Sequence, residues 1–407
     1  MNENFICYTN VEKTSLLLNS ARSVMEQATK KIRGIIVGGT GLIGGALVHY
    51  FNKCCPECIE ILSPNSKKMS LANEDDIESY TKHWEPDFII NAAIASIDSD
   101  PKLAYTINYI GSINLAKIAV NRNIPYIFIS SSAVLPEGEK LHENQHQPLT
   151  SSLSNYAKSK LMCELTLQHM HEKDGLDVTI VRLGIVYGKH DHKIQGFHRL
   201  LHSVADQALP FFLTAKGIQH SYTNAKKLPC FIHHTLQNRP EFSGQLFNFI
   251  DSEPVELVHL IKTIKNFLGV KKPRNIFLPL PIAIFGAKVL KLLLKNLLRI
   301  GIDAKMPAEL LFLNQFYKTQ TLDPAKLQNT SFKDPWPKET IYSKLPEIIE
   351  YYITRWERRN LISGFNDEFY EPQKDVQQFI TDPQQLLQKL HKSDFAPLSK
   401  FSKPDHN

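Results

Sequence analysis

Residues 34–44 read GIIVGGTGLIG, a short apolar run that leads into a glycine-rich turn, and a helical pattern follows over Ile43–Asn52. Gly38 permits a tight turn, Gly41 leaves room for a pyrophosphate, and Gly44 lets the helix lie close to the strand. Backbone N–H groups and the helix dipole then face the phosphates. The turn is not a P-loop, because no Gly-Lys-Ser/Thr follows. The stretch therefore predicts a dinucleotide-binding unit.

Short, mostly apolar runs recur through the first half of the chain and alternate with helical patterns. They lie at residues 34–37, 59–62, 88–90, 126–129 and 178–181. Such runs are typical of parallel strands that are covered on both faces. Their alternation with helices predicts an α/β fold with a doubly wound Rossmann parallel sheet.

Changes in composition divide the chain into four predicted parts. Residues 1–31 form an N-terminal helical extension, because apolar residues recur at helical spacing between 17 and 28. Residues 32–185 form the NAD(P)-binding Rossmann domain. Residues 186–345 are rich in loops, Pro and His and form a smaller substrate lobe, with one strand near 246–250 returning to the core sheet. Residues 346–407 form a C-terminal helix and a polar tail.

The composition excludes several classes of protein. The chain has 407 residues, 47 Lys plus Arg against 41 Asp plus Glu, a net charge of +6 and 43% hydrophobic residues, which is ordinary for a globular protein. The basic excess is spread along the chain, so we expect no nucleic-acid partner. Six cysteines do not make a disulfide scaffold, and we expect free thiols. Because no secretory signal is visible, the expected location is cytoplasmic.

No metal site is predicted. The Cys55-Pro-Glu-Cys58 pair has no second CxxC to complete a zinc site. The neighbouring His190 and His192 have no evident carboxylate-backed third ligand, and we interpret them as loop histidines.

The tip of the second predicted strand bears on the choice of cofactor. Dinucleotide binders often keep an acidic residue there for the ribose 2′-hydroxyl. Here the strand ends in Ser63-Pro-Asn65-Ser-Lys67-Lys68, with no Asp or Glu. Ser63, Asn65 and Lys67 could instead bind a 2′-phosphate. The tip therefore favours NADP over NAD, with NAD as the alternative.

A Tyr, a Lys and a run of Ser supply the predicted chemistry. Tyr156 and Lys160 stand four residues apart, which puts both side chains on one helix face. A free Tyr titrates near about 10, and an adjacent ammonium lowers that pKa. The strand at 126–129 runs into the Ser130–Ser132 run, at the end of the sheet where open α/β folds place ligands. One of these hydroxyls can hold a substrate oxygen against Tyr156.

Together these segments resemble the extended short-chain dehydrogenase/reductases, in the NAD-dependent epimerase/dehydratase group. The resemblance covers roughly residues 32–265. It is carried by GGTGLIG at 38–44, PDFIINAA at 86–93, Asn108, Gly111, Asn114 and Leu115, SSSA at 130–133, Tyr156 and Lys160, VRLGIVYG at 181–188, and LFNFI at 246–250.

The resemblance implies residue roles. Ser132 is the expected catalytic hydroxyl, with Ser131 as the alternative, Tyr156 is the acid/base, and Lys160 holds the ribose and lowers the Tyr pKa. The resemblance implies that the pyrophosphate is lined by Gly38, Gly41, Leu42 and Ile43. It also implies that Ala92 and Ala93 pass under the adenine-side ribose and phosphates. Relatives often dimerise through two helices, one of which carries the Tyr/Lys pair, so a homodimer is expected.

One segment departs from the family pattern. Members that act on nucleotide sugars often carry R-x-F/Y-x-x-V-x-D, where the Arg grips the diphosphate. The matching stretch here, residues 219–225, reads QHSYTNA and has neither the Arg nor the Asp. This difference argues against a nucleotide-diphosphate sugar as the substrate.

The first functional hypothesis is an NAD(P)-dependent oxidoreductase or epimerase/dehydratase acting on a secondary alcohol or ketone, with a sugar derivative as the expected small-molecule substrate. The second is a membrane-surface enzyme that resembles the 3β-hydroxysteroid dehydrogenases and acts on a sterol or lipid-linked substrate. It is suggested by residues 276–302, where an apolar helical pattern carries a stripe of Lys288, Lys291, Lys295 and Arg299. A helix packed on the second lobe is the alternative interpretation of that segment. The third hypothesis is a non-catalytic NAD(P)-binding scaffold or sensor.

Overall fold

The computed structural model describes residues 31–97, 99–193, 196–205, 211–214, 217–269, 274–277, 281–282, 285–286, 289, 292, 317–358 and 381–392. The helix predicted for residues 1–31 therefore lies outside the described residues, except for Lys31. Most of the segment 276–302 and most of the polar tail also lie outside them.

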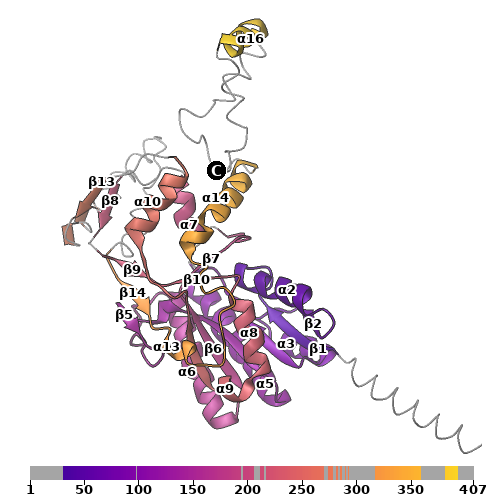
Figure 1. Cartoon of the computed structure of the whole chain (residues 1–407). Helices are drawn as coiled ribbons and strands as arrows, with labels where there is room; N and C mark the ends of the chain where they lie inside the picture. The colour runs from indigo at the N-terminus through magenta and orange to yellow at the C-terminus, as the bar shows by residue number, and fades with distance from the viewer. Residues whose placement is uncertain are drawn as a thin grey trace, which may run out of the picture.

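A six-stranded parallel sheet forms the centre of the molecule (Figure 1). Its order is β11-β6-β4-β3-β1-β2, and every neighbouring pair is parallel. The strands are β1 (Ile32–Val37), β2 (Ile59–Leu62), β3 (Phe88–Asn91), β4 (Tyr126–Ser131), β6 (Val178–Leu183) and β11 (Gln245–Phe249). The doubly wound α/β fold is confirmed. The strand order reverses between β1 and β3, so the ligand crevice is expected at the carboxyl ends of these two strands.

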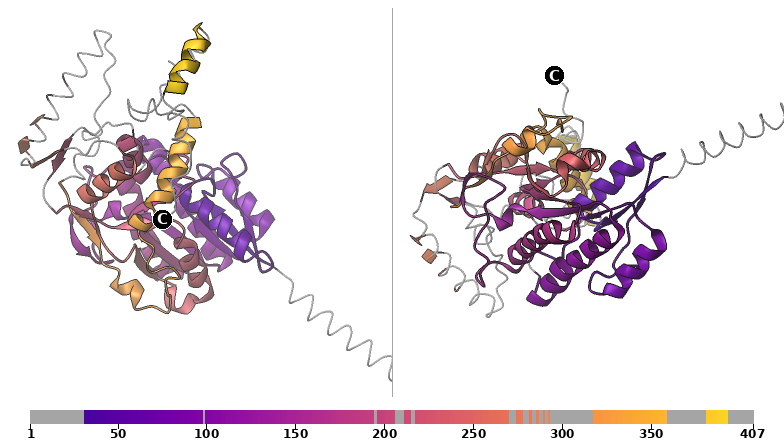
Figure 2. Two further views of the ribbon diagram at one scale, coloured as in Figure 1. Left: turned by 45° about the horizontal axis from the view of Figure 1, so that its top comes forward. Right: turned by 90° about the horizontal axis from the view of Figure 1, so that it is seen from below.

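Helices cover both faces of the sheet (Figure 2). Each face of the sheet carries its own hydrophobic core. Strand side chains alternate between faces, so Ile35 of β1 packs in one core and Ile36 in the other. One core joins the sheet to α3 (Glu74–Trp84), α5 (Gly111–Arg122) and α6 (Asn155–Asp174). The other joins it to α2 (Leu42–Cys54), α8 (Leu228–Gln237) and α9 (Arg239–Phe242). Both faces are therefore buried, which explains the apolar runs in the sequence.

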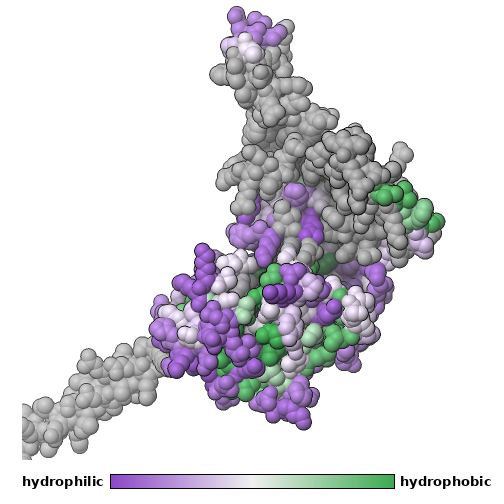
Figure 3. Space-filling view, turned by 180° about the vertical axis from the view of Figure 1, so that it is seen from behind, coloured by the Kyte–Doolittle hydropathy of each residue, from purple (hydrophilic) through white to green (hydrophobic). Residues whose placement is uncertain are grey.

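The described part of the second lobe contains three small sheets. β7 (Ile185–Tyr187) pairs with β10 (Tyr222–Asn224), and β8 (Phe211–Thr214) pairs with β13 (Arg274–Phe277). A four-stranded sheet has the order β12-β9-β14-β5, formed by Val255–Glu256, Gln219–His220, Gln320–Leu322 and Gly138–Leu141. Seen from behind, hydrophobic residues gather at the outer edge of this lobe, where β8 and β13 lie (Figure 3).

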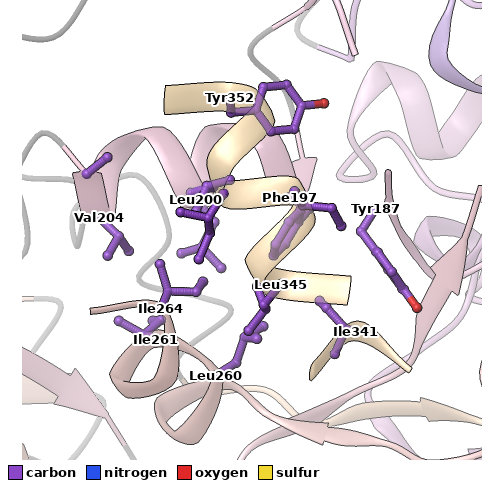
Figure 4. Packing of buried hydrophobic residues seen from close by; sticks show 14 of the residues in the cluster. Tyr187, Phe197, Leu200, Val204, Leu260, Ile261, Ile264, Ile341, Leu345 and Tyr352 are labelled. Carbon is purple, nitrogen blue, oxygen red and sulfur yellow. The ribbon is translucent and has the colours of Figure 1, made fainter. Parts of the chain in front are cut away.

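Three helices enclose the core of the second lobe: α7 (Gly196–Ala205), α10 (Leu257–Phe267) and α14 (Ile341–Arg358) (Figure 4). Helix α14 begins five residues before the predicted start at residue 346, because Ile341 and Leu345 are fully buried in this core. Short elements complete the described chain: α4 (Pro101–Leu103), η1 (Ala104–Ile110), η2 (Ser132–Val134), α13 (Ala325–Gln328) and α16 (Pro383–Lys392). Among the described residues, no helix is long and apolar enough to cross a membrane.

Candidate active site and nucleotide groove

Of three glycines in the turn, Gly41 has room for a side chain, whereas Gly38 and Gly44 do not. A Cβ at Gly38, where φ is +88°, would lie 2.7 Å from the backbone of Ala93, and a Cβ at Gly44 would lie 2.2 Å from the Gly38 carbonyl oxygen. At Gly41 the added Cβ would meet only the Gly38 oxygen, at 3.4 Å. Gly38 and Gly44 are therefore required by packing, whereas Gly41 faces open space.

The amino end of α2 is suited to an anion. Its N-cap is Gly41, which supplies no side-chain hydrogen bond, and the first turn contains no acidic residue. Backbone N–H groups at such an end carry a partial positive charge and remain available to a ligand. Leu42 and Ile43 lie in this first turn. The turn can therefore hold a pyrophosphate as the sequence predicts.

The tip after β2 is organised by its own side chains. The Ser63 hydroxyl donates a hydrogen bond to the Ile36 carbonyl at 3.0 Å. The Asn65 side-chain oxygen accepts the N–H groups of Lys67 and Lys68 at 3.0 and 3.1 Å. Two of the three residues predicted to hold a 2′-phosphate therefore shape the loop, while Lys67 is an exposed cation.

Ala92 and Ala93 follow β3 and lie beside the glycine turn. The Ala92 N–H donates to the Val37 carbonyl at 3.0 Å, and the Ala93 N–H donates to the Asn91 side chain at 3.1 Å. The structure thus places both residues next to Gly38, where the predicted nucleotide groove begins.

Helix α6 brings the Tyr/Lys pair to the end of β4. The helix begins after Ser154, whose hydroxyl accepts the Ala157 N–H at 3.2 Å. Ser131, at the last position of β4, lies beside the Tyr156 phenol. Burial raises the pKa of Tyr156, and the neighbouring Ser131 side chain acts to lower it.

Of the two hydroxyls named in the sequence analysis, Ser131, the alternative to Ser132, is the one whose side chain lies beside Tyr156. The strand extends to Ser131, and Ser132 begins the 3₁₀ turn η2. Successive strand residues point to opposite faces. Ser130 donates to Glu164 in the body of α6, whereas Ser131, at the end of the strand, lies beside Tyr156 in the first turn of the same helix.

Lys160 is almost completely buried, with 2% of its surface exposed. Its Nζ donates to the Ile129 carbonyl at 2.7 Å and lies 4.5 Å from the centre of the Phe128 ring. Burial lowers its pKa to about 8, against the opposing effects of Cys163 and Glu164. A lysine ammonium has three N–H donors. Beyond the Ile129 bond, this one can therefore donate to ribose hydroxyls.

A buried ion pair fixes α6 on the sheet. Arg182 of β6 and Glu164 of α6 are both 2% exposed in their side chains, and their closest atoms lie 2.7 Å apart. The second Arg182 nitrogen, Nη1, donates to the Glu143 and Gln145 carbonyls at 2.9 and 3.0 Å. This pair joins the helix of Tyr156 to the sheet and to the loop after β5.

Asn108 connects α6 to the loop after β3. It lies in η1, a π-helical stretch, and its side chain is buried. Its oxygen accepts the Ala95 N–H at 2.7 Å, and its nitrogen donates to Ser159 at 3.2 Å. Ser159 stands one residue before Lys160, so Asn108 helps to set the register of the candidate catalytic helix.

The segment 219–225 contributes buried groups from β9 and β10. Burial lowers the pKa of His220 to about 4, so its ring is neutral at pH 7. Tyr187 donates to Asp251 at 2.7 Å, and burial raises the pKa of this carboxyl to about 6. Lys227 lies 2.9 Å from Asp334 and 3.8 Å from Asp251. The lysine at this position is thus engaged with protein carboxylates.

The histidines after β7 contact α14. His190 bonds the Tyr351 hydroxyl at 3.0 Å, and His192 bonds Arg355 at 2.7 Å. His198 lies in α7, where the Trp356 indole donates to it at 3.1 Å. In the described part of the chain, no group of three or more His, Cys, Asp or Glu side chains is placed to hold a metal ion.

An open hollow lies away from the Tyr/Lys pair. It is lined by residues of α14 and of the loop after β7: Lys189, His192, Glu347, Glu350, Tyr351, Thr354 and Arg355. Neither the glycine turn nor the Ser131–Tyr156–Lys160 group contributes to it. The chemistry-bearing residues therefore gather at the carboxyl end of the central sheet and not at this hollow.

Comparisons with known proteins agree with this geometry. Residues 35–216 match the model of the NAD dependent epimerase/dehydratase family, which confirms the resemblance. "Uncharacterized protein MJ1055" of Methanocaldococcus jannaschii is 23% identical over 224 residues, which are 52% of this chain and 66% of that protein. "GDP-L-colitose synthase" of Yersinia pseudotuberculosis is 24% identical over 260 residues, 58% of this chain and 82% of that protein. The match to the first of these spans about two thirds of its length.

The fold also matches solved structures. The dTDP-glucose 4,6-dehydratase of Bacillus anthracis, crystallised with NAD, superposes with a TM-score of 0.57 at 16% identity, over 80% of this chain and 98% of that chain. At this level of identity the likeness establishes the Rossmann architecture.

Proposed function

Because residues 35–216 match the NAD dependent epimerase/dehydratase family, we propose that this protein is an NAD(P)-dependent oxidoreductase or epimerase/dehydratase acting on a secondary alcohol or ketone. The observation that carries the proposal is the Tyr156 phenol beside Ser131 at the carboxyl end of β4, with Lys160 one helical turn further on. A relative named for GDP-L-colitose synthesis supports a sugar derivative as the substrate.

The residues present fit a dinucleotide. Gly41 faces open space and the first turn of α2 offers uncapped N–H groups, so this turn would hold the pyrophosphate. When bound, the nicotinamide supplies a hydride acceptor or donor. The exposed Lys67 and the absence of an acid at the tip after β2 favour NADP over NAD.

Three side chains perform the proton chemistry. Tyr156 takes a proton from, or returns it to, the substrate hydroxyl, and Ser131 hydrogen-bonds the same oxygen. Lys160 binds the ribose through its remaining N–H groups and places positive charge near the phenol. Burial raises the pKa of Tyr156, so a phenolate at neutral pH would need a positive charge, such as that of Lys160 or the nicotinamide, close to the phenol.

The second lobe sets the limits on the substrate. Lys227 pairs with Asp251 and Asp334. The ring of His220 is neutral at pH 7, because burial lowers its pKa to about 4. These groups are poorly suited to bind a diphosphate, which needs charged donors.

Cofactor titration followed by turnover tests the proposal. NADPH and NADH are titrated by nicotinamide fluorescence against the wild type, Tyr156→Phe and Gly41→Ala, and secondary alcohols and ketones are then screened with the preferred form. We expect Tyr156→Phe to bind the cofactor and lose turnover. Cofactor-dependent turnover that survives Tyr156→Phe contradicts the catalytic role. Binding without any turnover in the wild type would favour the non-catalytic scaffold.

A homodimer is also proposed, from the surface beside α6. Leu103, Tyr105 and Leu165 are 47%, 54% and 37% exposed. They lie close together, because Tyr109 bonds Thr166 at 3.1 Å and stacks near Tyr105 with ring centres 5.9 Å apart. An exposed apolar patch of this kind is typical of a protein interface. Sedimentation velocity of the wild type against Tyr105→Asp tests it, and a wild type that is monomeric at all concentrations contradicts it.

A further inference from the structure

Cys55 and Cys58 lie in a tight turn between α2 and β2 that the proposed chemistry does not use. Cys55 is the C-cap residue of α2. Its carbonyl accepts the N–H groups of Cys58 at 3.2 Å and of Ile59 at 2.9 Å. A turn closed by such a bond holds its first and fourth Cα atoms within about 7 Å, and disulfides join Cα atoms about 4.4–6.8 Å apart. The turn therefore brings the two cysteines close enough for a disulfide with little movement of the backbone.

Contacts with the start of β1 hold this turn in place. The Cys58 carbonyl accepts the Ile32 N–H at 2.9 Å. The Pro56 carbonyl accepts a hydrogen bond from the Lys31 ammonium at 2.7 Å. The ring of Pro56 also fixes its own φ near the value required at the second position of a turn. The two cysteines are therefore kept as neighbours, and little further ordering of the chain is needed to join them.

The two thiols of the turn have different environments. Cys58 is exposed, whereas Cys55 is half-buried. The Cys55 Sγ lies 3.8 Å from Nδ1 and 3.9 Å from Nε2 of His233 in α8. Burial raises the pKa of the Cys55 thiol and lowers the pKa of His233, so the ring is neutral at pH 7. Cys55 is therefore a protonated thiol beside an imidazole that can accept its proton, while Cys58 faces the solvent.

Two other thiols of the described chain are less suited to a disulfide. Cys163 is buried in α6, its Sγ donates to the Asn108 carbonyl at 3.1 Å, and burial raises its pKa to about 12. Cys54 is exposed, but a bond between adjacent cysteines strains the peptide link that joins them. Among the described residues, no group of three or more His, Cys, Asp or Glu side chains is placed to hold a metal ion. The geometry of the turn therefore favours thiol–disulfide chemistry.

We propose that Cys55 and Cys58 form a reversible disulfide, with a small-molecule disulfide such as oxidised glutathione as the oxidant. The Cys58 thiolate attacks one sulfur of the oxidant, and the other sulfur leaves as a thiolate that takes up the proton that Cys58 lost. Cys55 then passes its proton to His233, and its sulfur attacks the Cys58 sulfur. This step breaks the mixed disulfide, and the second small thiol leaves with the proton from His233. Two protein thiols thus lose two electrons, and one small disulfide gains them.

Oxidation of the full chain in mixtures of reduced and oxidised glutathione tests the proposal. Free thiols are blocked with N-ethylmaleimide, and unreduced tryptic peptides are analysed by mass spectrometry. Residues 54–67 form one such peptide. We expect it to carry an internal disulfide and a single maleimide, on Cys54, and to lose the disulfide in dithiothreitol. Because urea abolishes the turn, the native chain should need about tenfold less oxidised glutathione for half-oxidation than the unfolded chain does.

Four substitutions separate the two steps. Cys55→Ser should stop at the mixed disulfide on Cys58, whereas Cys54→Ser should form the bridge as the wild type does. His233→Gln should accumulate the mixed disulfide, because the second step loses its proton acceptor and slows by at least about tenfold. His234→Gln is the matched control, since this neighbouring histidine bonds Ser331 at 2.8 Å and should leave both steps unchanged.

The proposal is overturned if the wild type forms no bridge within the 54–67 peptide, if Cys54 supplies one of the bridged sulfurs, or if urea leaves the required oxidant unchanged. Wild-type kinetics in His233→Gln overturn the role of the imidazole. The first three results come from the wild-type chain alone, so a variant that fails to fold does not affect them. NADPH binding by the reduced chain reports separately on the proposed function, because the glycine turn lies at the other end of α2.

Discussion

The glycine turn allows cofactor binding to be separated from packing by two substitutions of the same kind. At Gly44 an added methyl group would lie 2.2 Å from the Gly38 carbonyl oxygen, and the backbone there cannot yield as a flexible side chain would. We expect Gly44→Ala to lose about 1–3 kcal/mol of unfolding free energy, the usual cost of overpacking. Gly44→Ala should therefore melt earlier and bind nucleotide poorly.

Gly41→Ala should behave differently, because its methyl group would meet only one atom, at 3.4 Å. Alanine is a poorer N-cap than glycine, but it also restricts the unfolded chain, and the two effects oppose each other at about 0.5–1 kcal/mol each. The melting temperature should therefore stay close to that of the wild type. The same methyl group would keep a pyrophosphate from the helix N–H groups. Losing one charge-assisted hydrogen bond corresponds to about tenfold to a hundredfold in affinity.

Nicotinamide fluorescence and thermal melting on the same samples measure both quantities. The expected pattern is a normal melt with weak NADPH binding for Gly41→Ala, and an early melt for Gly44→Ala. If Gly41→Ala binds NADPH and NADH as tightly as the wild type, the groove over the glycine turn is not the cofactor site. If Gly44→Ala is as stable as the wild type, the packing argument fails.

Three further results are expected. Ser131→Ala should lower kcat about a hundredfold or more, whereas Ser132→Ala should change it only a few-fold, because Ser131 lies beside the phenol; equal effects in steady-state kinetics contradict the assignment. Arg182→Met leaves Glu164 buried without its partner and should cost about 3–5 kcal/mol in urea unfolding, while an unchanged midpoint would show that the pair is dispensable. The pKa of Lys160 falls from 10.5 to about 8 in the folded chain. The unfolded chain therefore binds more protons between those values, and the unfolding free energy should rise with pH there by up to about 1.4 kcal/mol per unit. Lys160→Met should remove that rise, and an identical pH profile would contradict it.

The central sheet could be predicted from the sequence because its signals are local. Runs such as residues 88–90 and 178–181 are apolar at consecutive positions since helices cover both faces of the sheet. The glycine turn is equally local, because Gly38 and Gly44 are fixed by contacts within a few residues of themselves or with the neighbouring strand. The alternation of these runs with helices then determined the doubly wound topology.

The details of the candidate site depend on contacts between distant residues, and the sequence did not supply them. The choice between Ser131 and Ser132 depends on where β4 ends and the turn η2 begins. The π-helical stretch that carries Asn108 has no simple sequence signature, although such stretches often occur at functional sites. The roles of Ser63 and Asn65 in shaping their own loop likewise depend on tertiary contacts.

Helix α14 has a consequence for how the protein is made. Its residues Ile341, Leu345, Tyr352 and Trp356 complete the core of the second lobe, although they are synthesised well after β11, the last strand of the central sheet. Domains generally fold in the order in which they leave the ribosome. The nascent chain can assemble most of its central sheet early, but the lobe above it stays open until translation has passed residue 356. A premature stop codon upstream of this helix would therefore release a polypeptide whose central sheet can fold but whose second lobe has an exposed hydrophobic core.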